Sequence, residues 1–314
     1  MNATTQLNAT DLAALERDSW IDAATASAFG LYRVNSADGA ALMGRTDRED
    51  YSGIVFPIFG PGEPQPREYF LRRDHPPLEL SNGKPKPKQK YLSPPGRSNR
   101  LLFGPGESMD ALTDIELPIL LVEGLKKVCA AWRFARHGGG APTFFVCGIA
   151  GVWGWRGTTG KAPDASGARV PVHGPIADLD RLAWAGRTVT ILFDSDTSTN
   201  SKVAAARRAL VAELRERGAL VAAPDLPVID DLDKTGFDDL LAAWGPERVL
   251  AWLDTARDAA PTADDLEVAR LAALPSIDYG KARKAAAERW GVPVGFVDAA
   301  VKGKQKEQAA NDGG

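Results

Sequence analysis

The 314-residue chain is predicted to adopt an α/β fold centred on a parallel sheet flanked by helices. Short apolar runs, each followed by turn residues, have the length of buried strands. Segments with apolar residues at helical spacing lie between several of these runs, and strands that alternate with helices form parallel sheets with right-handed crossovers. The predicted strands are residues 118–122, 143–147, 189–193 and 219–223, and the predicted helices are 125–137, 178–185, 201–217, 240–244 and 247–256.

The region before this sheet is predicted to be a small α+β domain over residues 1–112. Two short helices are expected within residues 9–30. Strands follow at 31–34, 53–59 and 68–73, and the turn sequence GPGEP separates the last two.

A basic stretch ends this first domain. Residues 81–106 carry six Lys or Arg and no Asp or Glu, although the whole chain has a net charge of −3. Such a stretch favours contact with a polyanion, and a solvated loop is the alternative. The side chains that we expect to meet nucleic acid or nucleotide phosphates are Arg72, Arg73, Lys84, Lys86, Lys88, Lys90 and Tyr91, with Arg156 from a later loop.

The chain is divided into four parts by these patterns. Residues 1–112 form the basic domain and 113–258 the sheet domain. Residues 259–301 are Ala-rich and predicted to be helical, and the polar residues 302–314 are predicted to be a disordered tail.

The composition excludes several classes of protein. No apolar run approaches the roughly 20 residues that span a bilayer, and the N-terminus lacks the pattern of a signal peptide. Cys129 and Cys147 lie in apolar contexts and are predicted to be buried thiols in a reducing cytosol. Two Cys and three scattered His exclude a structural zinc site of normal spacing. We therefore expect a cytoplasmic protein with no membrane partner.

Acidic residues follow two of the predicted strands. Glu123 ends the run at 118–122, and Asp194 and Asp196 follow the run at 189–193. Open α/β sheets place their ligands at the carboxyl ends of strands. If the two strands are neighbours, about 4.8 Å apart, the three carboxylates form a cluster that needs a hard divalent cation.

The Glu-Gly pair at 123–124 and the Asp-x-Asp motif at 194–196 together resemble the Toprim domain, which bacterial-type primases, topoisomerases and some nucleases share. The segments GIVFPI (53–58), YFLRR (69–73), KYLSP (90–94) and LFG (102–104) resemble the basic half of a bacterial-type primase core. The loop GVWGWR (151–156) and the segment LAALPSIDYGKARKAAAERWGV (271–292) resemble Toprim-like regions of phage and plasmid primase-helicase proteins. The resemblance covers roughly residues 10–301.

The resemblance implies a Toprim-like sheet and a DNA-directed nucleotidyltransferase, a primase of mobile-element type that makes short RNA primers in DNA replication. It implies that Glu123 acts in proton transfer and that Asp194 and Asp196 hold Mg²⁺ or Mn²⁺. Asp238 is the best match to a later metal-binding acid, with Asp239 as the alternative. The implied partners are a single-stranded DNA template, nucleoside triphosphates and a helicase on a separate chain.

The chain departs from the primase pattern in three ways. It has no amino-terminal zinc module and no helicase phosphate loop, and Lys127 stands where many primases carry an acid. Two other functions remain open: a Toprim nuclease that cleaves DNA or RNA with the same acids, and a non-catalytic DNA-binding adaptor.

Overall fold

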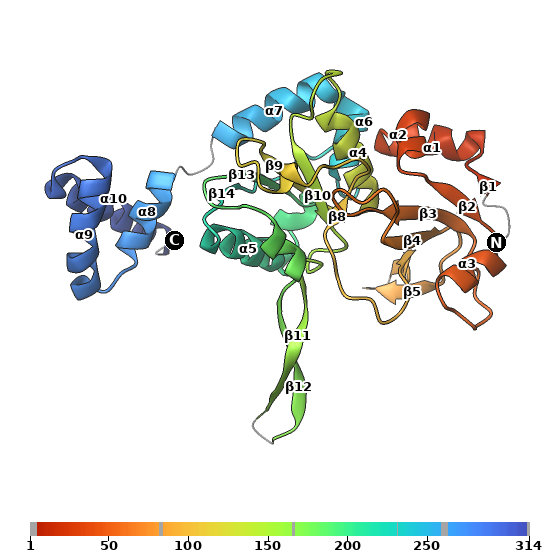
Figure 1. Cartoon of the computed structure of the whole chain (residues 1–314), viewed down its shortest axis with the longest axis horizontal. Coiled ribbons are helices and arrows are strands. Elements are labelled where there is room, and N and C mark those ends of the chain that lie inside the picture. Colours follow the sequence, from red (N-terminus) through yellow and green to blue (C-terminus); the bar gives the residue numbers. More distant parts are fainter. Residues whose placement is uncertain (1–4, 82–83, 165–166, 231, 259–262, 313–314) are drawn as a thin grey trace. The chain divides into compact units, whose positions relative to one another are not determined.

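The computed structural model describes residues 5–81, 84–164, 167–230, 232–258 and 263–312, and shows a mixed α/β protein (Figure 1). The chain divides into two compact units, Met1–Asp258 and Ala259–Gly314. The larger unit contains two five-stranded sheets, and the smaller unit is helical in its described residues. None of the helices in the described segments is both long and apolar enough to cross a membrane.

A five-stranded sheet forms the centre of the larger unit, with strand order β14-β13-β9-β10-β8. Strands β14, β13, β9 and β10 are parallel, and β8 runs antiparallel to β10 at one edge. The parallel part confirms the sheet expected from the alternation of strands and helices. The strands are β8 (Leu102–Phe103), β9 (Ile119–Glu123), β10 (Phe145–Ile149), β13 (Thr188–Leu192) and β14 (Leu220–Ala222).

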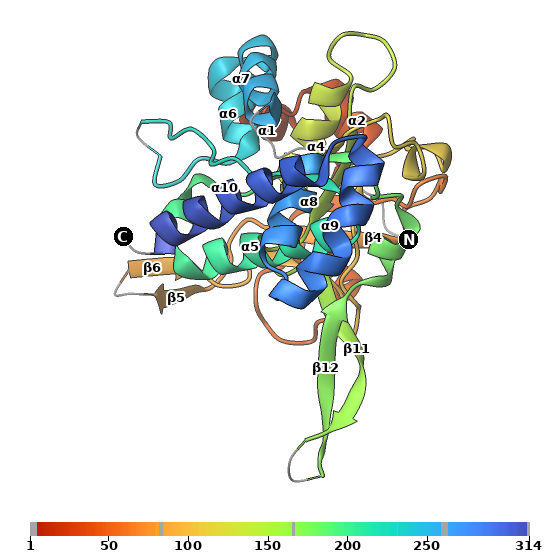
Figure 2. The same ribbon diagram turned by 90° about the vertical axis from the view of Figure 1, so that its left-hand side faces the viewer.

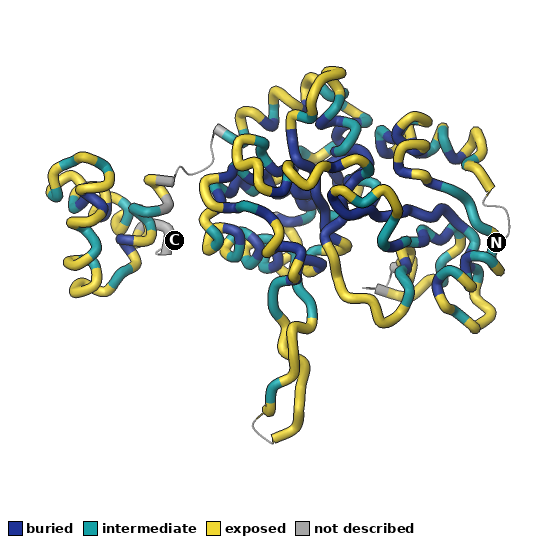
Figure 3. Tube along the Cα trace, in the orientation of Figure 1, coloured by how far each residue is buried: buried dark blue, intermediate teal, exposed yellow. Residues whose placement is uncertain are grey.

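Helices cover both faces of this sheet because successive side chains of a buried strand point to opposite sides. Leu120 and Val122 face one hydrophobic cluster, which includes residues of α4, α6 and α7. Ile119 and Leu121 face a second cluster, which includes residues of α5. The buried residues run through the middle of the unit (Figure 3). The helices are α4 (Leu125–Ala135), α5 (Ser201–Glu216), α6 (Phe237–Trp244) and α7 (Pro246–Asp258), and the short 3-10 helices are η1 (Asp110–Leu112), η2 (Ala177–Arg181) and η3 (Ser195–Ser198).

The N-terminal region forms an antiparallel sheet of order β1-β2-β3-β4-β7. Its residues Phe29 and Phe56 belong to the same cluster as Leu120, so this region shares a core with the central sheet. Residues 1–112 and 113–258 are therefore parts of one compact unit. The elements are β1 (Thr5–Gln6), α1 (Ala9–Ser19), α2 (Ala23–Ala28), β2 (Tyr32–Val34), α3 (Ser36–Leu42), β3 (Gly53–Ile58), β4 (Glu68–Arg73) and β7 (Tyr91–Leu92).

Two hairpins lie outside these sheets. One pairs β5 (Leu78–Ser81) with β6 (Lys84–Pro87), and the other pairs β11 (Arg156–Pro163) with β12 (Arg169–Pro175). The second hairpin projects from the central sheet region in two perpendicular views (Figures 1 and 2). From the sequence, residues 151–156 are expected to form a loop, and no strand is predicted between 148 and 188. The hairpin was missed because neither of its strands has a buried residue.

The smaller unit packs three helices around a separate cluster that includes Leu271, Val297 and Val301. They are α8 (Ala263–Ala272), α9 (Ser276–Trp290) and α10 (Val294–Asp312). The structure extends α10 through residues that were predicted to form a disordered tail. The polar composition of 302–312 favoured that prediction, but these residues continue a helix whose Val297 and Val301 are buried, and Gln305 donates a hydrogen bond to the carbonyl of Ala272.

Candidate active site

The acids after strands β9 and β13 lie at the same edge of the central sheet. The two strands are parallel neighbours, with Leu192 opposite Val122. Glu123 ends β9, and Asp194 follows β13 by two residues. The condition set by the sequence, that these two strands are neighbours, is therefore met. It brings together two carboxylates that are far apart in the sequence.

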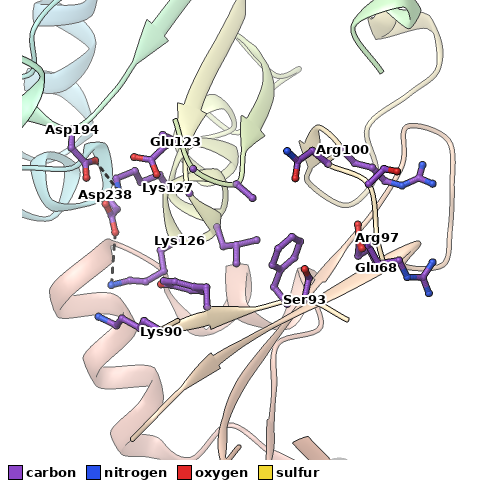
Figure 4. A pocket seen from close by; sticks show the side chains of 18 of the residues that line it. Glu68, Lys90, Ser93, Arg97, Arg100, Glu123, Lys126, Lys127, Asp194 and Asp238 are labelled. Atoms are coloured by element: carbon purple, nitrogen blue, oxygen red, sulfur yellow. Dashed lines mark ion pairs between the residues drawn. The ribbon is translucent and has the colours of Figure 1, made fainter. Parts of the chain in front are cut away.

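A pocket of about 640 Å³ opens at this edge and contains Glu123, Asp194 and Asp238 in its wall (Figure 4). Asp238 comes from the first turn of α6. The opposite wall is formed by the N-terminal sheet and the segment after it, including Phe70, Lys90 and Arg100. The pocket therefore lies where the acidic end of the central sheet meets the basic part of the N-terminal region, as Figure 4 shows.

Two lysines hold the Asp194 carboxylate. The Nζ atom of Lys127 lies 2.9 Å from Oδ1 of Asp194, and the Nζ atom of Lys234 lies 2.6 Å from Oδ2. Asp194 is only 4% exposed. Burial by itself raises the pKa of this carboxyl, but the two lysines outweigh burial and hold the pKa below its usual range. The Asp194 carboxyl is therefore ionised, and the two lysines balance its negative charge.

Lys127 is the central cation of the site. It lies in the first turn of α4, which begins after Gly124. A cation in this turn opposes the helix dipole, and burial lowers the pKa of its ammonium. The carboxylates of Asp238, Asp194 and Glu123 overcome both effects and raise the pKa of Lys127 above its ordinary value. The ammonium is thus charged and surrounded by acids.

Glu123 and Asp238 differ from Asp194 in their partners. Burial raises the pKa of Glu123, and Lys127 opposes this while Asp194 adds to it. Glu123 is thus better suited than Asp194 to carry a proton. The Oδ1 atom of Asp238 is buried and has no hydrogen-bond partner among the described residues, and its Oδ2 atom lies 3.8 Å from Nζ of Lys126. A buried oxygen without a donor has a vacant coordination position that a cation can use.

The donor chemistry of this pocket fits a hard divalent cation, because Glu123, Asp194 and Asp238 supply carboxylate oxygens. In their present arrangement, however, no three Asp, Glu, His or Cys side chains in the described part of the chain are grouped to hold a metal. The ammonium of Lys127 lies among these carboxylates instead. A cation that binds Asp194 must therefore compete with a lysine.

The structure separates the other predicted residues into groups. Asp196 lies in η3, is partly buried, and is not part of the pocket wall. Lys90 and Tyr91 line the pocket, whereas Lys86 and Lys88 are exposed on or beside the β5–β6 hairpin and do not. The side chain of Lys84 lies outside the described part of the chain.

Arg73 was assigned to nucleic acid from its sequence context, but it is used inside the N-terminal region. Its side chain is 1% exposed, pairs with Glu49 at 2.8 Å and donates a hydrogen bond to the carbonyl of Asp50. Its guanidinium also lies over the Tyr51 ring. We therefore leave Arg73 out of the site, because a buried and paired guanidinium does not meet a ligand.

Arg72 and Arg156 also lie outside the pocket wall. Arg72 is partly buried on β4, opposite Tyr91 on β7. The Arg156 guanidinium lies over the rings of Trp153 and Trp155 and donates a hydrogen bond to the carbonyl of His173. These contacts fix the base of the β11–β12 hairpin, so Arg156 has a structural role there.

Several pocket residues were missed from the sequence. They are Glu68, Arg97, Arg100, Lys126 and Lys234. Glu68 is 6% exposed, and burial raises its pKa. The two arginines belong to the basic stretch 81–106, so its net charge signalled them, although only the fold shows which of its cations face the pocket. Nothing in the local pattern distinguishes Glu68 from other strand residues.

The comparison with protein families matches residues 110–248 to a domain of unknown function, DUF3854. The matched segment is less than half of the chain. It includes Glu123, Lys127, Asp194 and Asp238, and excludes the cations of the N-terminal wall. A search of curated proteins found no match.

Proposed function

We propose that this chain is the Toprim-type catalytic core of a magnesium-dependent primase that makes short RNA primers on single-stranded DNA. The observation that carries the proposal is the composition of the pocket. Carboxylates from the end of a parallel sheet form one wall, and cations from a separate basic region form the other. Nucleotidyl transfer needs both kinds of side chain. Acids bind the metal and accept the proton, and cations bind the phosphates.

The cations lining the pocket are suited to triphosphate and template phosphates. Arg97 and Arg100 lie beside Glu68, away from Glu123, Asp194 and Asp238, whereas Lys126 and Lys90 lie on the same side as Asp238 (Figure 4). Arginine binds phosphate through paired N–H donors and lysine acts as a point charge. Tyr91 offers a ring on which a base can stack. A chain of phosphates can therefore extend across the pocket toward the carboxylates.

Glu123, Asp194 and Asp238 would perform the chemistry at the acidic end. Asp194 and Asp238 would hold Mg²⁺ or Mn²⁺ together with Asp196, which lies one short turn beyond Asp194. The metal would neutralise the triphosphate and assist the attacking hydroxyl. Glu123 would take the proton of the 3′-hydroxyl, whose oxygen bonds to the α-phosphorus as the bond to pyrophosphate breaks. The raised pKa of Glu123 suits it to receive that proton.

The direct test supplies single-stranded DNA, ribonucleotides and Mg²⁺ to the purified chain. Extension to short RNA products supports the primase. Shortening of the DNA instead shows a nuclease that uses the same acids.

The acids are tested by Asp194→Asn and Asp238→Asn, each of which should reduce primer synthesis at least about a hundredfold. Asp233→Asn is the matched control, because Asp233 is exposed on the same loop as Lys234 and does not line the pocket. The double variant Asp194→Asn with Asp196→Asn separates enzyme from adaptor. If it leaves the biological role of the protein intact, the chain acts as a non-catalytic DNA-binding adaptor and the proposal is wrong.

A further inference from the structure

The position of Lys127 suggests a property that the Toprim resemblance does not include. Its ammonium occupies the space between the carboxylates to which the proposed function assigns the metal. The site therefore has a cation of its own.

The surroundings of Lys127 are built to hold it there. Its side chain is 18% exposed and that of Asp194 is 5% exposed, so water screens the pair weakly. The end of the Lys127 stem also packs against the backbone of Gly236, close to where a Cβ atom would lie.

The other pocket lysines are held differently. Lys234 pairs with the same carboxylate, but its side chain is 52% exposed and can leave into solvent. Lys126 lies 3.8 Å from Asp238, at the limit of an ion pair. Lys90 lines the pocket, and no ion pair with an acid is found for it among the described residues. Lys127 alone is both well buried and closely paired among these four.

We infer that Lys127 is a built-in counter-ion that competes with a divalent cation for Asp194. The inference rests on the proposed function, because it concerns the metal site of that function. The Asp194 carboxylate already has two lysine partners, so a divalent cation would bring further positive charge to a buried group whose charge is balanced. Like charges a few ångströms apart repel strongly where water screens them weakly. The cation binds only as the ammonium moves away, so Lys127 weakens metal binding in the absence of substrate.

This competition would connect metal binding with substrate binding. The displaced ammonium remains in a pocket that also contains Lys90, Lys126 and Arg100, where a substrate phosphate would give it a new partner. Substrate and metal would then favour each other, because each relieves the electrostatic cost of binding the other.

The experiment measures Mn²⁺ affinity of the full chain by electron paramagnetic resonance, without nucleotide or DNA. Lys127→Met removes the charge and keeps an unbranched side chain only one atom shorter, and it should bind Mn²⁺ at least about tenfold more tightly than the unaltered chain. Lys90→Met removes a charge from the same pocket without breaking an acid pair. It is the matched control and should change the affinity less than about threefold.

A second variant and a thermal melt guard against a folding defect, because Lys127→Met leaves Asp194 with only Lys234. Lys127→Gln is neutral and can still donate a hydrogen bond to Asp194. At least one of the two variants should fold, and Mn²⁺ should raise its melting temperature more than that of the unaltered chain. If neither variant folds, Lys127 is needed for the structure and the competition model is overturned.

Adding Asp194→Asn to Lys127→Met should abolish the gain in Mn²⁺ affinity. Equal gains in Lys127→Met and Lys90→Met, or a gain that survives Asp194→Asn, would overturn the inference. The outcome is separate from that of the proposed function, because Mn²⁺ binding is measured without catalysis. A chain that shows the competition but makes no primers would contradict the primase alone.

Discussion

At the scale of single residues, one buried arginine of the larger unit, Arg187, has a structural role away from the pocket. Arg187 precedes β13 and has no exposed surface. Its guanidinium donates hydrogen bonds to the carbonyls of Leu117, Leu112 and Ala111 at 2.7–3.1 Å. These bonds fix the segment that leads into β9, the strand that carries Glu123. Arg187 is thus a structural clamp: its hydrogen bonds connect the start of β13 to the segment before β9.

Replacing Arg187 with Leu should lower the free energy of unfolding by about 3 kcal/mol, since three carbonyls each lose a hydrogen bond from the guanidinium. Among the described residues, only the carbonyl of Leu112 keeps another donor, the N–H of Ala183. Urea unfolding followed by circular dichroism measures this change. Arg208→Leu is the control, because Arg208 is exposed on α5, and its effect should stay within about 0.5 kcal/mol. Equal effects of the two substitutions would contradict the clamp.

At the scale of elements, helix α4 shows how local sequence positions the site. Gly124 has a φ of +109°, which only glycine adopts without strain. This turn lets the chain pass from β9 into α4 at once. As a result Glu123 at the end of β9 and Lys127 in the first turn of α4 both reach the pocket. Gly124 is therefore a structural requirement of this strand-to-helix connection.

The helices of the smaller unit are joined by ion pairs of Glu267 on α8. Its carboxylate pairs with Arg270 at 2.6 Å and with Arg289 of α9 at 2.8 Å. The hydrogen bond from Arg270, opposed by burial and assisted by Arg289, lowers the pKa of Glu267 from 4.5 to about 2. A carboxyl whose pKa is lower in the folded state stabilises the fold above its unfolded pKa.

The stabilisation from Glu267 should therefore be complete above about pH 4.5 and should be lost as the pH falls toward 2. At pH 7, Glu267→Gln should cost about 1 kcal/mol, and the variant should lose less stability on acidification. Hydrogen exchange of peptides from α8 and α9, corrected for intrinsic rates, measures both effects. Glu288→Gln alters an exposed residue of α9 and should match the unaltered chain. The same acid sensitivity in Glu267→Gln would contradict this assignment.

At the scale of the whole molecule, the two compact units differ in their share of the site. Every residue that lines the pocket belongs to Met1–Asp258. The two hydrophobic clusters on either side of the central sheet also lie within this unit, and the cluster of the smaller unit is separate. The larger unit thus contains a complete core and a complete pocket.

A chain that ends after Asp258 should fold and unfold cooperatively, because it keeps its core. A chain that ends after Trp244 should not, since it loses α7 and the buried side chains of Val249 and Leu253, each worth about 2–5 kcal/mol. Thermal unfolding by near-ultraviolet circular dichroism distinguishes the two. Absence of a cooperative transition in the longer fragment would show that residues 259–314 are needed for folding.

The sequence by itself predicted those features that depend on local pattern. Strand β9 is a continuous apolar run, β13 is mostly apolar and α5 has apolar residues at helical spacing, so neighbouring residues contain the information. The acids Glu123 and Asp194 were found because strand ends in α/β sheets meet at one edge. The β11–β12 hairpin was missed because both of its faces are exposed.

Only the tertiary structure decided which charges meet. Arg73 and Arg72 are adjacent in a strand, yet their opposite faces make one a buried structural group and leave the other partly exposed. Lys127 pairs with Asp194 because β13 lies beside β9, a strand order that no local pattern encodes. Which charges pair depends on distances between residues that the fold brings together. These distances determine whether acids at strand ends bind a metal ion, a lysine, or first one and then the other.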